Sequence, residues 1–171
     1  EVFQTNKSDM IETLAQLQGL YDEAAEGGGE EAVARIRKRG KMPIRERISH
    51  VLDQDSPFLE ISPLAAWRSS YDIGSGFVVG IGVIEGVECV ILGHDPSVRA
   101  GAFNPFNSKK LMRGLEIARE NRMPYVQFVE SAGADLRGAS GDSKGDPNAE
   151  AEAALQREVD HFAESGRLFY E

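Results

Sequence analysis

The chain has 171 residues, of which 41% are hydrophobic and 27% charged, with a formal net charge of −9. This length is enough for one sizeable hydrophobic core, and the acidic balance argues against nonspecific nucleic-acid binding, which needs an excess of Lys and Arg. No apolar run reaches the roughly 18 residues that span a bilayer, and a single cysteine, Cys89, excludes a disulfide framework or a thiolate metal cluster within the chain. We expect no membrane partner and a cytoplasmic location, or the mitochondrial matrix in a eukaryote.

Helices are predicted before the first strand. Asp9 followed by Glu12 forms a capping-box pattern, and apolar residues then recur at helical spacing until the glycines at 27–29. Further helices are expected over 30–39 and from Pro43 to about residue 53. Residues 1–55 are therefore predicted to form an N-terminal helical segment.

Strands follow this segment. Residues 76–84 and 87–93 alternate or run apolar around the pair Glu85-Gly86, which predicts a β-hairpin. A helix over 108–121 and a strand over 125–130 continue the strand, helix, strand rhythm of a right-handed crossover. The predicted fold class is α/β.

Two further elements are predicted near the carboxyl end of the chain. Residues 137–148 are polar and turn-rich, which indicates a surface loop, either a plain flexible loop or a lid over a substrate. Residues 149–169 have the spacing of a helix with a broad apolar face.

Small residues directly follow the strand over 125–130. Backbone N–H groups of Ala132 and Gly133 would then be presented at the strand's carboxyl end, where ligands of open α/β folds gather. Such donors form an oxyanion hole when they stabilise negative charge on a carbonyl oxygen. The alternative is an ordinary strand-to-helix turn.

A second candidate segment follows the hairpin. Ala100, Gly101 and Ala102 are small enough for a pantetheine arm or acyl group to approach closely, and Phe103 and Phe106 are candidate pocket walls. Turn structure and core packing explain the same residues without a ligand.

Basic residues cluster between the predicted second and third helices, against the acidic background. They are candidates to bind the phosphates of an adenine nucleotide such as coenzyme A, and a solvated helix face is the alternative. The cluster consists of Arg35, Arg37, Lys38, Arg39, Lys41, Arg45 and Arg47, of which Arg35, Arg37 and Arg39 are the proposed substrate contacts.

Other reactive side chains are few. His50, His94 and His161 lack metal-ligand spacing, so no metal site is predicted. His94 beside Asp95 suits either a catalytic pair or, preferably, a structural histidine. Ser131 is not in a nucleophile elbow, which disfavours hydrolase chemistry.

In their order and spacing, the segments of residues 30–171 resemble the carboxyltransferase (beta) subunit of biotin-dependent acyl-CoA carboxylases, of the propionyl-CoA or methylcrotonyl-CoA carboxylase type. Within that family, Phe103-Asn104-Pro105-Phe106 followed by two lysines is closer to the methylcrotonyl-CoA or geranyl-CoA type. The segments that carry the resemblance are 41–48, 51–53, 58–60, 76–84, 87–93, 95–102 and 109–118.

The resemblance implies a crotonase-like ββα spiral, of which residues 56–171 would form an incomplete first part. It implies carboxyl transfer from carboxybiotin to the enolate of an acyl-CoA, with oxyanion holes for the thioester and for the biotin ureido oxygen. Implied partners are acyl-CoA, a biotin carboxyl carrier or biotin carboxylase subunit, and further copies in a family hexamer. The second oxyanion hole lies in a half that this chain does not contain, so the isolated chain is expected to be inactive.

Residues Glu130 and Ala132 depart from the commoner Asp-Ser-Gly-Gly form of the family motif. If the first glycine position needs a positive φ, Ala132 would be strained there. Two alternatives therefore stay open: a crotonase-like acyl-CoA decarboxylase or hydratase without biotin, and a noncatalytic CoA-binding or assembly module.

Overall fold

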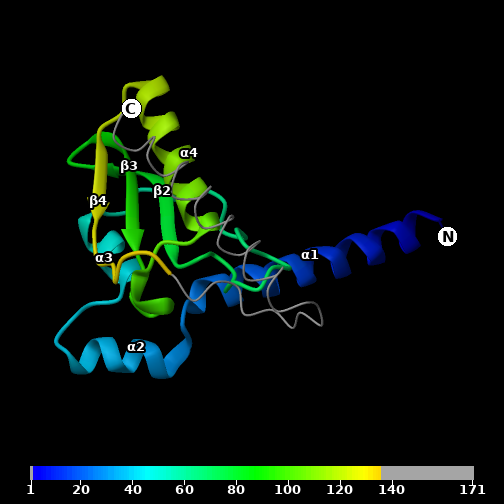
Figure 1. Ribbon diagram of the computed structural model, residues 1–171. Coiled ribbons are helices and arrows are strands. Elements are labelled where there is room, and N and C mark those ends of the chain that lie inside the picture. Colours follow the sequence, from blue (N-terminus) through cyan, green and yellow to red (C-terminus); the bar gives the residue numbers. More distant parts are fainter. Residues whose placement is uncertain (1, 136–171) are drawn as a thin grey trace, which may run out of the picture.

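The computed structural model describes residues 2–135. In this part, helices surround a small sheet, and one long helix extends away from it (Figure 1). The loop predicted over 137–148 and the helix predicted over 149–169 lie outside the described residues. The proposed division of the chain at residue 55 stays a prediction.

The sheet has four strands in the order β1-β2-β3-β4, which are Leu59–Glu60, Phe77–Ile84, Val87–His94 and Tyr125–Phe128. The first three are antiparallel, and β4 pairs parallel to β3 after a crossover through α4, Pro105–Asn121. The predicted hairpin and crossover, and with them the α/β class, are confirmed.

A tight turn sets the register of the hairpin. Glu85 and Gly86 both have positive φ, 50° and 75°, as a two-residue type I′ turn requires. Both of their amides donate to the carboxylate of Asp53, each at 2.7 Å. A residue that follows α3, Ile44–Val51, therefore holds the turn between β2 and β3.

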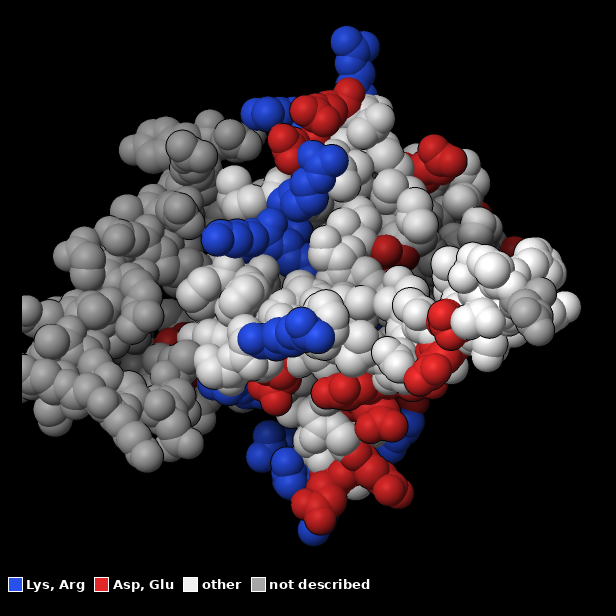
Figure 2. All heavy atoms as spheres, turned by 90° about the vertical axis from the view of Figure 1, so that its right-hand side faces the viewer, with Lys and Arg blue, Asp and Glu red and all other residues white. Residues whose placement is uncertain are grey.

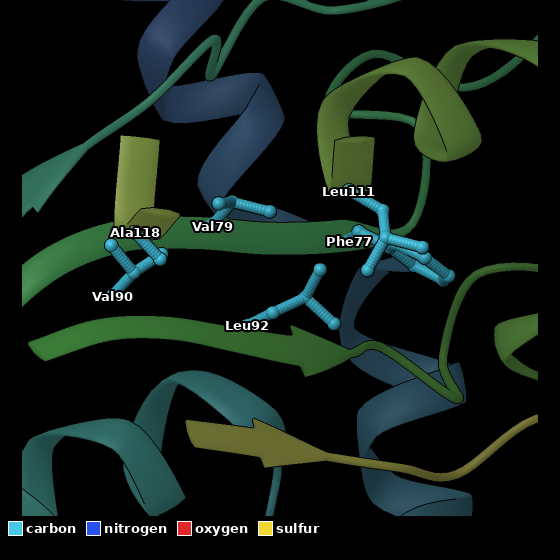
Figure 3. Packing of buried hydrophobic residues seen from close by; sticks show 6 residues of the cluster. All are labelled: Phe77, Val79, Val90, Leu92, Leu111 and Ala118. Atoms are coloured by element: carbon cyan, nitrogen blue, oxygen red, sulfur yellow. The ribbon is translucent and has the colours of Figure 1, made fainter. Parts of the chain in front are cut away.

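Both faces of the hairpin are buried, because alternate side chains of each strand point to opposite sides. On one face, Phe77, Val79, Val90 and Leu92 pack with residues of α4 (Figure 3). The opposite face packs against α3 and consists of Ile44, Ile48, Val78, Cys89 and Ile91. The structure thus has a helix, sheet, helix order of layers, and Cys89 is a free thiol buried in this core.

Close approach of α3 to the sheet requires a glycine. A Cβ built on Gly93 would lie 2.2 Å from Cγ1 of Ile44, well inside van der Waals contact. The absent side chain at Gly93 therefore allows Ile44 to reach the backbone of β3.

Helix α4 begins at Pro105 rather than near residue 108, because Asn104 caps it. The Asn104 side chain accepts from the amides of Phe106 and Asn107, and the Asn107 side chain accepts from the Asn104 amide, which completes a capping box. Proline at the first helical position needs no amide partner, so the earlier start is favourable. Both asparagines also donate to the carbonyl of Ser75, which fixes the start of α4 to the segment before β2.

The first helix, α1, covers Val2–Glu26, so the predicted capping box at Asp9 is wrong. Asp9 lies inside the helix, where its carbonyl accepts a bond of 2.9 Å from the Thr13 hydroxyl. The helix already begins before Asp9 and Glu12. Local sequence preferences do not distinguish a polar pair inside a helix from one that caps its start.

Only the carboxyl end of α1 packs on the body of the molecule. Ala24 is buried there, whereas apolar side chains further along the helix are exposed. The glycine turn after α1 leads into α2, Gly29–Lys38, and the Gly28 amide donates to the Ser97 hydroxyl at 2.9 Å. The exposed apolar side chains of α1 are Val2, Phe3, Met10, Ile11, Leu14 and Tyr21.

No helix within residues 2–135 is both long and apolar enough to cross a membrane. On the face of the molecule towards which α1 points, Lys and Arg side chains lie in separate groups between acidic and uncharged areas (Figure 2). This face offers no continuous basic surface of the kind that binds nucleic acid without sequence preference.

A lysine is buried between α4 and the sheet. The ammonium of Lys110 donates to the Phe77 carbonyl at 2.7 Å and lies 3.9 Å from the Glu60 carboxylate. The pKa of Lys110 is lowered to about 8, chiefly by burial; the Glu60 charge opposes this effect and the Arg45 charge adds to it. Arg45 itself makes two bonds to Glu60, so the buried charge belongs to a three-residue cluster.

We predict that Lys110 makes the free energy of unfolding rise between about pH 8 and pH 10.5, the range between its folded and ordinary pKa values. The unfolded chain holds the proton there while the folded chain does not, so higher pH favours folding by up to about 3 kcal/mol. Urea unfolding of the wild type and of Lys110→Met across this range checks the effect. Parallel pH profiles for the two proteins would contradict it, because other groups contribute equally to both.

Candidate functional site

The two segments with candidate oxyanion and pocket residues lie side by side. Beyond the strands, the Ala132 amide donates to the Ala100 carbonyl at 3.1 Å, and the Phe103 amide donates to the Gly133 carbonyl at 2.8 Å. A third bond of 2.8 Å joins the Asp135 amide to the Phe103 carbonyl, and Phe103 and Ala134 form a parallel bridge. The pairing extends the parallel contact of β3 and β4 beyond their carboxyl ends, which is where α/β folds bind ligands.

The first segment forms a left-handed turn. Arg99, Ala100 and Gly101 form the short helix η1, and all three have positive φ, at 46°, 55° and 69°. For the two residues other than glycine this conformation costs about 1–2 kcal/mol each. Strain of this kind persists only where the surroundings impose it, and it often lies at functional sites.

Side-chain contacts of Arg99 hold the left-handed turn. Its guanidinium donates to Asp72 and Asp135, both at 3.0 Å, and to the Ser70 carbonyl at 3.3 Å. It also lies over the ring of Tyr71, 4.8 Å from the centroid. Arg99 therefore joins η1 to two other segments, residues 70–72 and Asp135.

The two candidate oxyanion amides have different partners. The Ala132 amide is used by the Ala100 carbonyl, whereas the Gly133 amide donates to the exposed Ser131 hydroxyl at 3.1 Å. Gly133 has the positive φ, 96°, and Ala132 does not, so alanine at position 132 carries no left-handed strain. Gly133 is exposed, and within residues 2–135 a Cβ built on it would meet nothing within 4 Å, so there is open space on that side of the residue.

The candidate pocket residues pack within the protein. Phe103 lies edge-on to Phe77, with centroids 5.3 Å apart, and Phe106 is tilted against Tyr71 at 5.6 Å. Ala102 is buried, and Gly101 is buried beneath the Glu130 carbonyl. Core and turn packing account for these contacts, and a role as pocket walls stays a prediction.

The basic cluster is largely occupied by carboxylates. Arg35 lies 3.9 Å from Glu31 in the same helix, and Arg37 pairs with Glu46 of α3. Among the described residues Arg39 has no acidic partner, and it is exposed. A contact of these arginines with coenzyme A phosphates stays a prediction, for which Arg39 is the freest of the three.

Two further cations of this cluster meet at the candidate site. Lys41 and Arg47 both bind the carboxylate of Glu130, at 2.5 and 2.8 Å. The Lys41 contact, together with Arg47, lowers the pKa of Glu130 although partial burial opposes this. These pairs join residues more than eighty positions apart, so no local sequence signal reveals them.

His94 has a structural environment. Its ring is fully buried, stacks on Phe77 at 4.1 Å and lies 3.1 Å from the Gln127 side-chain nitrogen. Burial lowers the pKa of His94, against a smaller opposite effect of the Gly101 backbone. The Asp95 carboxylate instead accepts from the Ser97 hydroxyl, so the catalytic-pair alternative has no geometric support. Within residues 2–135 no group of His, Cys, Asp or Glu is arranged to hold a metal ion.

Comparison with known proteins identifies a family and several relatives. A model of the carboxyl transferase domain family matches residues 35–150. The probable biotin-dependent acyl-coenzyme A carboxylase beta2 subunit of Mycobacterium tuberculosis is 46% identical over 138 residues, which are 77% of this chain and 26% of that protein. The mitochondrial methylcrotonoyl-CoA carboxylase beta chain of Dictyostelium discoideum is 41% identical over 78% of this chain and 23% of its own.

Solved structures give the same result. The beta subunit of geranyl-CoA carboxylase from P. aeruginosa superposes with a TM-score of 0.70 at 36% identity, over 81% of this chain and 26% of that one. The transcarboxylase 12S hexamer, with methylmalonyl-coenzyme A bound, gives a TM-score of 0.69 at 28% identity, over 74% of this chain and 26% of its own.

The chain belongs to the carboxyl transferase domain family. Its likeness to carboxyltransferase beta subunits of biotin-dependent acyl-CoA carboxylases and the expected crotonase-like α/β fold are both confirmed. The chain spans about a quarter of the length of the relatives that it matches.

We predict that Gly101→Ala destabilises the protein more than Gly133→Ala. Both positions have positive φ, so both variants are strained by about 1–2 kcal/mol, but only at Gly101 would the new Cβ lie 2.0 Å from the Glu130 carbonyl oxygen. The overlap adds about 1–3 kcal/mol. Urea unfolding of both variants measures the difference, and equal losses would show that η1 does not pack tightly on residue 130.

Proposed function

We propose that this chain is the part of a biotin-dependent carboxyltransferase subunit that holds the thioester carbonyl of an acyl-CoA. The observation that carries the proposal is the backbone pairing of residues 100–103 with 132–135 at the carboxyl ends of β3 and β4. It leaves Gly133 exposed, and within residues 2–135 the amide of Gly133 donates to the Ser131 hydroxyl, which can rotate away.

The residues of the chain supply binding and electrostatic stabilisation. A thioester oxygen that replaces the Ser131 hydroxyl would accept from the Gly133 amide, and a preorganised donor of this kind contributes about 3 kcal/mol to an enolate-like transition state. The Ala132 amide is engaged with Ala100, so the proposed donor here is Gly133 in the first place. The transfer itself moves a carboxyl group from a biotin nitrogen to the α-carbon of the thioester, and the α-proton to that nitrogen.

Substrate and cofactor follow from family membership as proposals. The acceptor would be a branched unsaturated acyl-CoA of the methylcrotonyl or geranyl type, because relatives named for these substrates match over most of this chain. Coenzyme A phosphates would lie near Arg39, with Arg35 and Arg37 as further contacts. The proposed partners are a biotin carboxyl carrier and a biotin carboxylase subunit.

Assembly into a homo-oligomer is also proposed, as is a cytoplasmic location, or the mitochondrial matrix in a eukaryote. The exposed apolar side chains of α1 support association, because monomeric proteins seldom expose so many on one projecting element. One of the matching structures is described as a hexamer assembly.

The proposal is tested by carboxylation assays. A full-length subunit that contains this chain, combined with biotin carboxylase and carrier subunits, ATP and labelled bicarbonate, should transfer label to methylcrotonyl-CoA or geranyl-CoA in preference to propionyl-CoA. Avidin should abolish the transfer, because it sequesters biotin. Turnover that avidin does not inhibit would favour a crotonase-like decarboxylase or hydratase, and absence of label with every thioester would refute the proposal.

A further inference from the structure

Glu130 connects the α2–α3 region to the candidate site. Its carboxylate accepts hydrogen bonds from Lys41 at 2.5 Å and from Arg47 at 2.8 Å. Arg47 also donates to the Met42 carbonyl at 2.8 Å, which fixes its side chain. The backbone of Glu130 packs closely on Gly101: a Cβ built on Gly101 would lie only 2.0 Å from the Glu130 carbonyl oxygen. Residue 130 is therefore fixed through its side chain and its backbone at once.

The opposite end of the same segment is fixed in a similar way. Asp135 pairs with Arg99 at 3.0 Å, and its side chain is only 1% exposed. Residues 131–134 between these two anchors are exposed, so their own side chains pack on little. The position of the Gly133 amide thus depends on the backbone pairing with residues 100–103 and on the side-chain anchors at 130 and 135.

Burial separates the Glu130 contacts from an ordinary surface ion pair, which contributes about 0–1 kcal/mol. The Glu130 and Arg47 side chains are 21% and 25% exposed, and one carboxylate binds two cations. The pair of Arg37 and Glu46 also joins α2 to α3, but its side chains are 55% and 42% exposed. It provides a matched control within the same region.

We propose that Glu130 is a positioning residue, whose carboxylate, clamped by Lys41 and Arg47, fixes residues 131–134 so that the Gly133 amide faces the substrate carbonyl. The inference rests on the proposed function. It adds that two members of the basic cluster, Lys41 and Arg47, act by fixing the segment that carries the candidate donor and not by binding the substrate. Glu130 touches no reacting atom in this account.

The experiment compares Glu130→Gln with the control Glu46→Gln in the full-length subunit assembled with its biotin carboxylase and carrier subunits. Hydrogen exchange of a peptide covering 131–135, read by mass spectrometry, should become about tenfold faster in Glu130→Gln and stay unchanged in Glu46→Gln. Turnover should fall about tenfold or more with KM changed less than about threefold, because geometry rather than binding is lost. Thermal unfolding of both variants confirms that the fold is retained.

A second variant checks the route of the effect. Lys41→Met combined with Arg47→Met should reproduce the faster exchange, and adding Glu130→Gln should change little further, because the three residues act as one unit. Exchange in Glu130→Gln that equals the control would overturn the inference, as would faster exchange with unchanged turnover in an active enzyme. If the wild type does not carboxylate any acyl-CoA, the proposed function fails by itself, and the exchange contrast still decides whether Glu130 fixes the segment.

Discussion

The parallel pairing of residues 100–103 with 132–135 is the interaction on which the site depends. Three backbone hydrogen bonds join the segments beyond the ends of β3 and β4, at a point where regular strand pairing has already stopped. This pairing sets the Gly133 amide beside the left-handed turn of η1. It also consumes the Ala132 amide, so the same contact that builds the site selects which donor stays available.

Each layer of the fold contributes to that contact. Burial of both faces of the β2–β3 hairpin fixes the position of β3 between the helix layers. Helix α4 connects β3 to β4, which pairs beside it. The buried asparagines that cap α4 tie its start to the segment before β2. Ion pairs then hold the outer ends, with Arg99 at residue 135 and Lys41 and Arg47 at residue 130. Apolar packing therefore places the strands, and backbone pairing together with ion pairs places residues 130–135 after β4.

Local patterns predicted the hairpin, the crossover and the helices after α1 because their signals lie within a few residues. Glu85-Gly86 between two apolar runs favours a two-residue turn. Gly40 marks the end of one helix and Pro43 the start of the next through their own backbone preferences, independent of distant contacts. The start of α1 was predicted wrongly, because Asp9 and Glu12 resemble a cap but the helix continues past them. The start of α4 was predicted three residues late, because its cap depends on a buried contact with Ser75.

Much of the site was not predictable in this way. Small residues after a strand indicated the region of Ala132 and Gly133. The partner of the Ala132 amide, however, is the carbonyl of Ala100 in a distant segment, so no local signal shows that only the Gly133 amide stays available. The basic cluster suggested phosphate binding, whereas most of its members pair with carboxylates. One of these carboxylates belongs to Glu130, just after β4. Long-range charge pairing has no sequence period, so only the coordinates show how the segment with the candidate site is held.

A structure of the full-length subunit with a nonhydrolysable acyl-CoA analogue tests the central claim most directly. The account predicts the acyl carbonyl oxygen about 2.9 Å from the Gly133 nitrogen, with the Ser131 hydroxyl turned away and the pairing of Ala100 with Ala132 intact. An acyl carbonyl bound elsewhere, with the Gly133 amide still donating to Ser131, would contradict it.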